Sequence, residues 1–122
     1  MSAESQFYAL LSGHAALTAE VDDRIAVNAV PEGSGYPCVA FAVRTDNDTG
    51  ATLLGDNEDA LAVITVECWA TNPGDARALA DLVRAAVDTA DAARCAHVSG
   101  DTTVFDEEHG LDGVQLQVEW WP

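Results

Sequence analysis

The sequence predicts an α+β domain whose sheet is mostly antiparallel, with the element order α-β-β-β-α-β-β. Three observations predict it: one amphipathic helix with clear start signals after residue 71, stretches of alternating apolar and polar residues on both sides of it, and turn-rich connections between them. We expect one short N-terminal helix and one longer helix to pack on the sheet. The 122 residues, 48% of them hydrophobic, suit a single domain over residues 1–122.

The first third of the chain predicts a helix followed by two strands. Residues 2–12 place their apolar side chains on one helical face, and a second short helix fits around residues 17–21. From residue 24 the period changes to two, which predicts a strand that ends before Pro31. The next strand, residues 37–44, is apolar on both faces, so we expect both of its faces to be covered.

Residues 45–59 contain two turn-like clusters and no apolar period, which predicts a long acidic loop. Carboxylates this close together invite a calcium-loop interpretation. However, Gly50 would stand at the fifth ligand position and Asn57 at the twelfth, where that motif needs an oxygen-bearing side chain and a glutamate. A solvated acidic loop is the better interpretation, and its acidic residues are Asp46, Asp48, Asp56, Glu58 and Asp59.

The strand predicted at residues 61–69 sorts into two faces. Trp69 points to a mixed face of apolar and polar residues, whereas the opposite face is wholly apolar and consists of Ala62, Ile64, Val66 and Cys68. The thiol of Cys68 is therefore expected in the core.

The helix that follows has the clearest signals in the chain. Asn72 is a good N-cap, Pro73 fits the first turn, and Asp75 suits the helix dipole. On the outer face Arg84 can pair with Asp88 four residues later. The predicted buried stripe consists of Ala76, Leu79, Ala80, Val83, Ala86 and Val87.

Two strands close the chain, a weak one near residues 102–105 and a strong one at residues 114–121. In the strong strand the residues expected to face inward are Val114, Leu116, Val118 and Trp120. Those expected to face outward are Gln115, Gln117, Glu119 and Trp121.

The charge of the chain excludes several function classes. There are 21 Asp and Glu residues against 5 arginines and no lysine, for a formal net charge of −16. Binding to nucleic acid or to an anionic membrane needs clustered basic residues, so we expect neither partner. The acid excess fits a salt-adapted organism, or a surface that must repel a polyanion, and both interpretations stay open.

No motif in the sequence indicates catalysis, a metal or a cofactor. The three histidines lie in segments unrelated to Cys68, so a thiolate nucleophile lacks a partner base. Cys95 and His97 share a face of an extended segment and could be joined by Cys38 and Cys68, but zinc sites usually show two short ligand spacings and only one exists here. We therefore expect no catalytic residue, no metal and no cofactor.

The placement of tryptophan is the feature that points to binding. Trp69 and Trp121 both lie on the mixed face of their strands, and tryptophan is enriched at interaction hot spots. Two interpretations stay open: a second layer covers this face, or the face is an interface. The interface candidates are Trp69, Trp121, Gln115, Gln117 and Glu119.

Four stretches, taken in order, resemble one protein family. They are ALLSGHAALTAEV, DDRIAVNAVPEGSGYPCVAF, TLLGDNEDALAVITVECWATNPGDARALADLVRAAV and FDEEHGLDGVQLQVEWW. Together they resemble the tail-completion or tail-terminator proteins of long-tailed phages and related tailed viruses. The lack of lysine and the acidic loop depart from the family pattern, and a halophilic host would fit them.

The resemblance implies a structural role in the virion. Such proteins form a ring, typically a hexamer, at the head-proximal end of the tail tube, where they end tube polymerisation and join the tail to the head. The implied partners are further copies of the chain, the tail tube protein and the head-tail connector or stopper protein, with DNA passing through the lumen. The implied location is the tail or neck of the virion, after synthesis in the host cytoplasm. The acidic loop would face the lumen or a neighbouring ring.

Other functions fit the sequence less well. One alternative is a head-tail joining stopper, a neck protein or another minor tail protein. A lower alternative is a small enzyme or metal-binding module that uses Cys68, Cys95 and His97.

Overall fold

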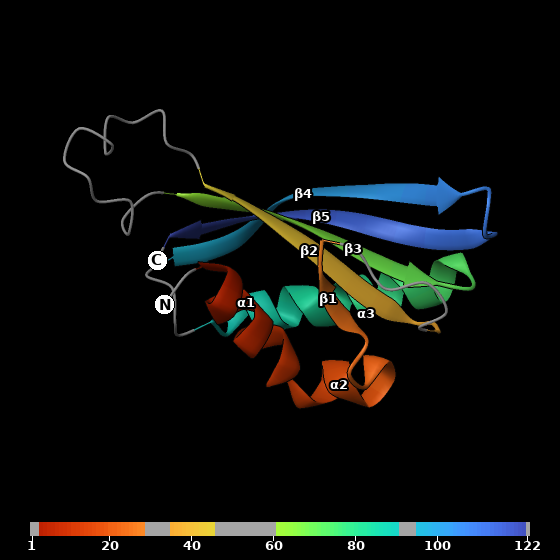
Figure 1. Ribbon diagram of the computed structural model, residues 1–122, viewed down its shortest axis with the longest axis horizontal. Coiled ribbons are helices and arrows are strands. Elements are labelled where there is room, and N and C mark those ends of the chain that lie inside the picture. Colours follow the sequence, from red (N-terminus) through yellow and green to blue (C-terminus); the bar gives the residue numbers. More distant parts are fainter. Residues whose placement is uncertain (1–2, 29–34, 46–60, 91–94, 122) are drawn as a thin grey trace.

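The computed structural model in Figure 1 describes residues 3–28, 35–45, 61–90 and 95–121. Its elements are α1 (Ala3–Ser12), α2 (Ala15–Val21), β1 (Ile25–Val27), β2 (Cys38–Thr45), β3 (Ala62–Ala70), α3 (Pro73–Asp88), β4 (Cys95–Asp106) and β5 (Leu111–Trp121). The predicted α+β class is confirmed, and α2 is the second short helix that fitted around residues 17–21. The predicted acidic residues at 46–59 lie outside the described residues. None of the helices in the described ranges is long and apolar enough to cross a membrane.

The five strands form one sheet in the order β1-β2-β3-β5-β4. The β1–β2 pair is parallel and all the other pairs are antiparallel, as predicted for a mostly antiparallel sheet. β3 is central: Ile64 lies opposite Val43 of β2 and opposite Val118 of β5. This register fixes which side chains share a face.

The core lies between one face of the sheet and the three helices, which all lie on the same side of it (Figure 1). α1 is held there by Phe7, whose ring contacts the rings of Phe41 and Trp120 edge-on at centroid distances of 5.0 and 5.7 Å. The indole Nε1 of the fully buried Trp120 donates a hydrogen bond to Gln6 Oε1 at 3.1 Å, which satisfies the one polar atom of that side chain. The inward residues predicted for β3 and β5 are all buried.

α3 begins and packs as the sequence predicts. Asn72 Oδ1 accepts a hydrogen bond from the backbone N–H of Asp75 at 2.8 Å, and Pro73 occupies the first turn. All six residues of the predicted stripe are buried. The prediction that Arg84 pairs with Asp88 is wrong, because its guanidinium instead reaches Asp101 of β4 at 2.6 Å.

β4 is much longer than the predicted strand at residues 102–105. It runs from Cys95 to Asp106 and pairs with β5, with a register shift between Val98 and Gly100. This bulge breaks the alternation of side chains, so no continuous period of two marks the strand in the sequence. The strand places a long edge at the side of the sheet.

Candidate assembly interface

The second face of the sheet has no covering layer in the part of the chain that the structure describes. The register places Trp69, Gln115, Gln117, Glu119 and Trp121 on this face. The structure thus brings all five predicted interface candidates together. We call this surface the open face; its other members include Arg44, Val63, Thr65, Glu67, His97, Thr102 and Val104.

The strand β2 shows where this face begins. Cys38 and Ala40 are buried although they lie on the open face, whereas Ala42 is exposed. The expectation that both faces of β2 are covered is therefore correct only for its first half. From Ala42 onward β2 contributes exposed residues, Ala42 and Arg44, to the open face.

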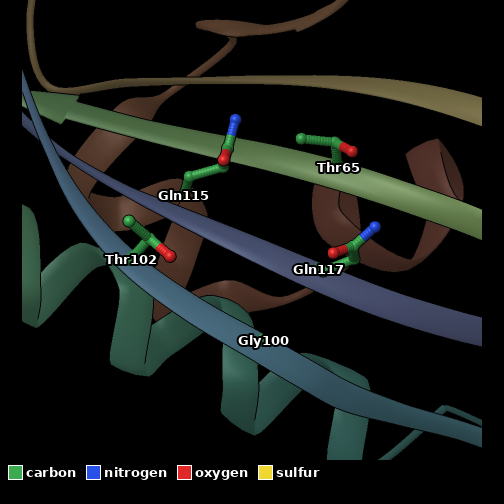
Figure 2. Close-up of a pocket in the computed structure, with 5 residues that line it drawn as sticks. All are labelled: Thr65, Gly100, Thr102, Gln115 and Gln117. Atoms are coloured by element: carbon green, nitrogen blue, oxygen red, sulfur yellow. The ribbon is translucent and has the colours of Figure 1, made fainter.

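The centre of the open face is a polar, uncharged hollow of about 160 Å³. Figure 2 shows its lining, where Thr65 of β3 and Gln115 and Gln117 of β5 stand beside β4. On β4 the lining residues are Gly100 and Thr102. A side chain at Gly100 would meet Gln117, since an added Cβ would lie 3.3 Å from Gln117 Cβ, so the glycine keeps the hollow open. Hydroxyl and amide groups at this site can donate and accept hydrogen bonds to a partner.

Trp69 lies toward one end of the open face and packs on its own sheet. A Cβ added at Gly113 would lie 2.7 Å from Trp69 Cε3 and 2.8 Å from Cζ3, so the indole ring lies directly over the glycine. The same Cβ would lie 2.9 Å from Val104 Cγ2. Trp69 is therefore half-buried by contacts within the chain. A glycine within a strand pattern is the sequence signal that could have indicated this close approach.

Trp121 lies at the opposite end of the open face, where the backbone register pairs it with Cys95. It remains 39% exposed. Beside it, His97 Nε2 lies 2.9 Å from Glu119 Oε2. The two tryptophans thus lie toward opposite ends of the open face, and between them Glu67 lies opposite Gln115, beside the uncharged lining of the hollow.

One family model, described as tail completion protein gp17, matches residues 5–122. The chain belongs to this family. The fold is also that of a chain in a solved structure titled "Virion of native gene transfer agent (GTA) particle". That likeness has a TM-score of 0.66 and 20% sequence identity, and covers 98% of this chain and 93% of the other. No curated protein matches the sequence.

As a member of the tail completion family, the chain is a structural protein of a phage tail and a component of the virion. The resemblance stated from the sequence is confirmed.

The residues considered for metal chemistry whose side chains the structure describes lie on two different faces of the sheet in this tail completion protein. Cys68 faces the helices, whereas His97 lies on the open face next to Glu119. Burial raises the pKa of the Cys68 thiol to about 12 and that of Cys38 to about 11. Both thiols are therefore protonated at neutral pH. The side chain of Cys95 lies outside the described residues.

The β4–β5 turn contains a cluster that the sequence interpretation missed. Ligand atoms of Asp106, Glu108 and His109 lie within 4.8 Å of one another. Asp106 is already engaged: its carboxylate accepts hydrogen bonds from the backbone N–H groups of Glu108 and His109 at 3.1 and 3.3 Å, and lies 2.9 Å from His109 Nδ1. The bond to His109 is the main cause that lowers the pKa of Asp106. The hydrogen bonds that Asp106 accepts from the two backbone N–H groups stabilise the β4–β5 turn.

Asp101 of β4 is held by two of the five arginines. Arg77 Nη1 and Arg84 Nη2 each lie 2.6 Å from the same oxygen, Asp101 Oδ2. These bonds, with Arg77 the larger cause, lower the pKa of the carboxyl group. The cluster ties α3 to β4.

Proposed function

We propose that the chain forms a ring at the head-proximal end of the tail tube, ends polymerisation of the tube, and joins the tail to the head connector. The observation that carries the proposal is the family match over residues 5–122. The ring is proposed to be a hexamer with DNA passing through its lumen. The proposed partners are other copies of the chain, the tube protein and the connector or stopper protein.

The open face supplies a surface for such contacts. A closed ring on a tube needs a lateral contact between neighbouring subunits and a contact with the ring next to it. In the lateral contact, one surface of a subunit meets a different surface of its neighbour. The open face has Trp69 and Trp121 toward its ends and hydrogen-bonding groups between them, which suits one of these contacts. We propose that a neighbouring protein is contacted by Trp121, Gln115, Gln117 and Glu119. We propose that Trp69 lies at the edge of the same contact.

The acidity of the chain fits passage of DNA. With a formal charge of −16, the walls of a lumen would repel phosphate groups and leave no site at which DNA could rest. We propose that Asp46, Asp48, Asp56, Glu58 and Asp59 face the lumen or the neighbouring ring.

The test of this part neutralises four carboxylates. Asp46, Asp48, Asp56 and Asp59 are changed together to Asn, and assembly and DNA delivery are compared with a control in which exposed Asp22, Asp23, Asp81 and Asp88 are changed to Asn. Both variants lose four negative charges. A defect only in the first variant supports the proposal, and normal assembly and delivery in that variant rejects it.

The role proposed here is not enzymatic. The two described thiols are buried and protonated at neutral pH, and the open face carries hydrogen-bonding and aromatic groups that suit a partner surface.

Deletion of the gene tests the proposed function. Particles without a terminator are expected to carry tails of uncontrolled length that do not join heads, and the wild-type gene supplied separately should restore them. Tails of normal length beside heads that lose DNA would instead identify a stopper. Electron microscopy of the particles distinguishes these outcomes.

A further inference from the structure

β4 presents a long unpaired edge at the side of the sheet. The strand Cys95–Asp106 pairs with β5 on one side, and no strand pairs with its other side within the ranges that the structure describes. Edge strands of this kind expose backbone N–H and C=O groups, which can accept a further strand. Proteins usually block such edges with charge, proline or a bulge.

The two halves of β4 differ in this protection. The register shift between Val98 and Gly100 disrupts the first half. The second half contains the run Thr102, Thr103, Val104 and Phe105, which has high β-propensity and contains neither charge nor proline. Phe105 is 58% exposed, the largest exposed fraction among the large apolar side chains described. This run is open to strand pairing.

The acidic residues at the two ends of this run both contact side chains within the chain. Asp101 is bound by Arg77 and Arg84, and Asp106 lies 2.9 Å from His109. A chain with 21 acidic residues and 5 arginines thus places two arginines against the single acid that precedes the run. The two arginines at Asp101 therefore lower the repulsion that a second acidic molecule meets at the start of residues 102–105, whereas exposed Glu107 and Glu108 follow the end of the run.

We propose that the backbone of Thr102–Phe105 pairs with a strand of a second copy of this chain, so that the sheet continues across the boundary between neighbouring subunits. The proposal rests on the proposed ring. The two arginines at Asp101 favour a second copy as the partner: another copy carries the same −16 charge and needs a contact where the repulsion between the chains is lowered, whereas a basic partner would bind the exposed carboxylates elsewhere. In a closed ring the added strand comes from a different surface of the neighbour than its own β4.

Proline substitutions test the pairing directly. In an antiparallel strand, successive N–H groups point alternately toward the partner and away from it. Of Thr102→Pro and Thr103→Pro, one therefore removes a bond to β5 and the other removes an outward N–H. The variant that keeps a wild-type melting temperature identifies the outward position, and Thr102→Ser and Thr103→Ser are the matched controls.

Each variant is supplied to the deletion virus, and particles with finished tails are counted. We expect the folded proline variant to weaken association by about fivefold at each contact, compounded around the ring, since one backbone hydrogen bond is lost per contact. Its yield of finished particles should fall far below that of the serine controls. A wild-type yield from the folded proline variant would overturn the pairing.

A lysine variant covers the case in which neither proline variant folds. Lysine on an edge strand blocks pairing without removing an N–H group, so Thr103→Lys should reduce finished particles, whereas Thr71→Lys, an exposed residue before α3, should not. Equal yields from these two variants would overturn the pairing.

If the deletion gives tails of uncontrolled length but the β4 variants restore finished particles, only the strand pairing fails. If the deletion gives tails of normal length, the proposed ring function fails first.

Discussion

The contact of Trp69 with Gly113 leads to a prediction about stability. In the Gly113→Ala variant the new Cβ would lie 2.7 to 2.9 Å from three atoms of Trp69 and Val104. Carbon atoms prefer about 3.5–4.0 Å, so the indole ring must move by roughly 1 Å or the strands must separate. Overpacking of this kind costs about 1–3 kcal/mol, and replacing glycine in a strand returns about 0.5–1 kcal/mol. We expect a net destabilisation of about 1–2 kcal/mol.

Urea unfolding of the wild type and the variant measures this difference. The same substitution is then made in a Trp69→Ala background, which removes the two indole atoms of the clash and leaves the contact with Val104 Cγ2. There we expect Gly113→Ala to cost less than in the wild type, because the clash with the indole is gone. If Gly113→Ala is neutral in the wild-type background, or costs as much without the indole as with it, the proposed packing of Trp69 is wrong.

Three further predictions concern other described residues. Trp121→Ala should leave the melting temperature almost unchanged, because the side chain is 39% exposed. The same change should abolish incorporation into particles, because we propose that Trp121 contacts a neighbouring protein; loss of folding would place the side chain in the core instead. Asp101→Asn should lower the melting temperature above about pH 4, where the wild-type carboxylate is ionised and bound to the arginines. The difference between the two proteins should shrink as the pH falls through the lowered pKa of Asp101 in the folded state, because the carboxyl group stabilises the fold only while it is ionised. Thiol titration of the native protein should find Cys68 slow to react at pH 8, because its pKa is about 12; rapid alkylation that does not require unfolding would contradict its burial.

The sequence predicts the parts of this fold that depend on local pattern. The helix at residues 73–88 has a cap, a proline and an apolar stripe that all agree, and the predicted cap and buried stripe are confirmed. The strands β3 and β5 alternate cleanly, so the inward residues could be read without knowing the pairing. The five interface candidates were found together because they follow the same alternation.

The missed features depend on contacts between distant segments. Arg84 binds Asp101 rather than Asp88 because β4 passes beside α3, which no local spacing indicates. The bulge at residues 98–100 hides the length of β4. The packing of Trp69 on Gly113 depends on the β3–β5 register, in which the two residues lie opposite each other. Whether the open face is an interface depends on partners, so it stays a prediction.

We propose that this tail completion protein forms the ring that ends the tail tube. An electron cryomicroscopy reconstruction of the particle neck measures this most directly, because the fold of three helices on a five-stranded sheet can be placed in density. We expect one ring of this chain between the last tube ring and the head connector, with β4 at the boundary between neighbouring copies. Density for this fold on the head side of the connector, or at the far end of the tail, would contradict it.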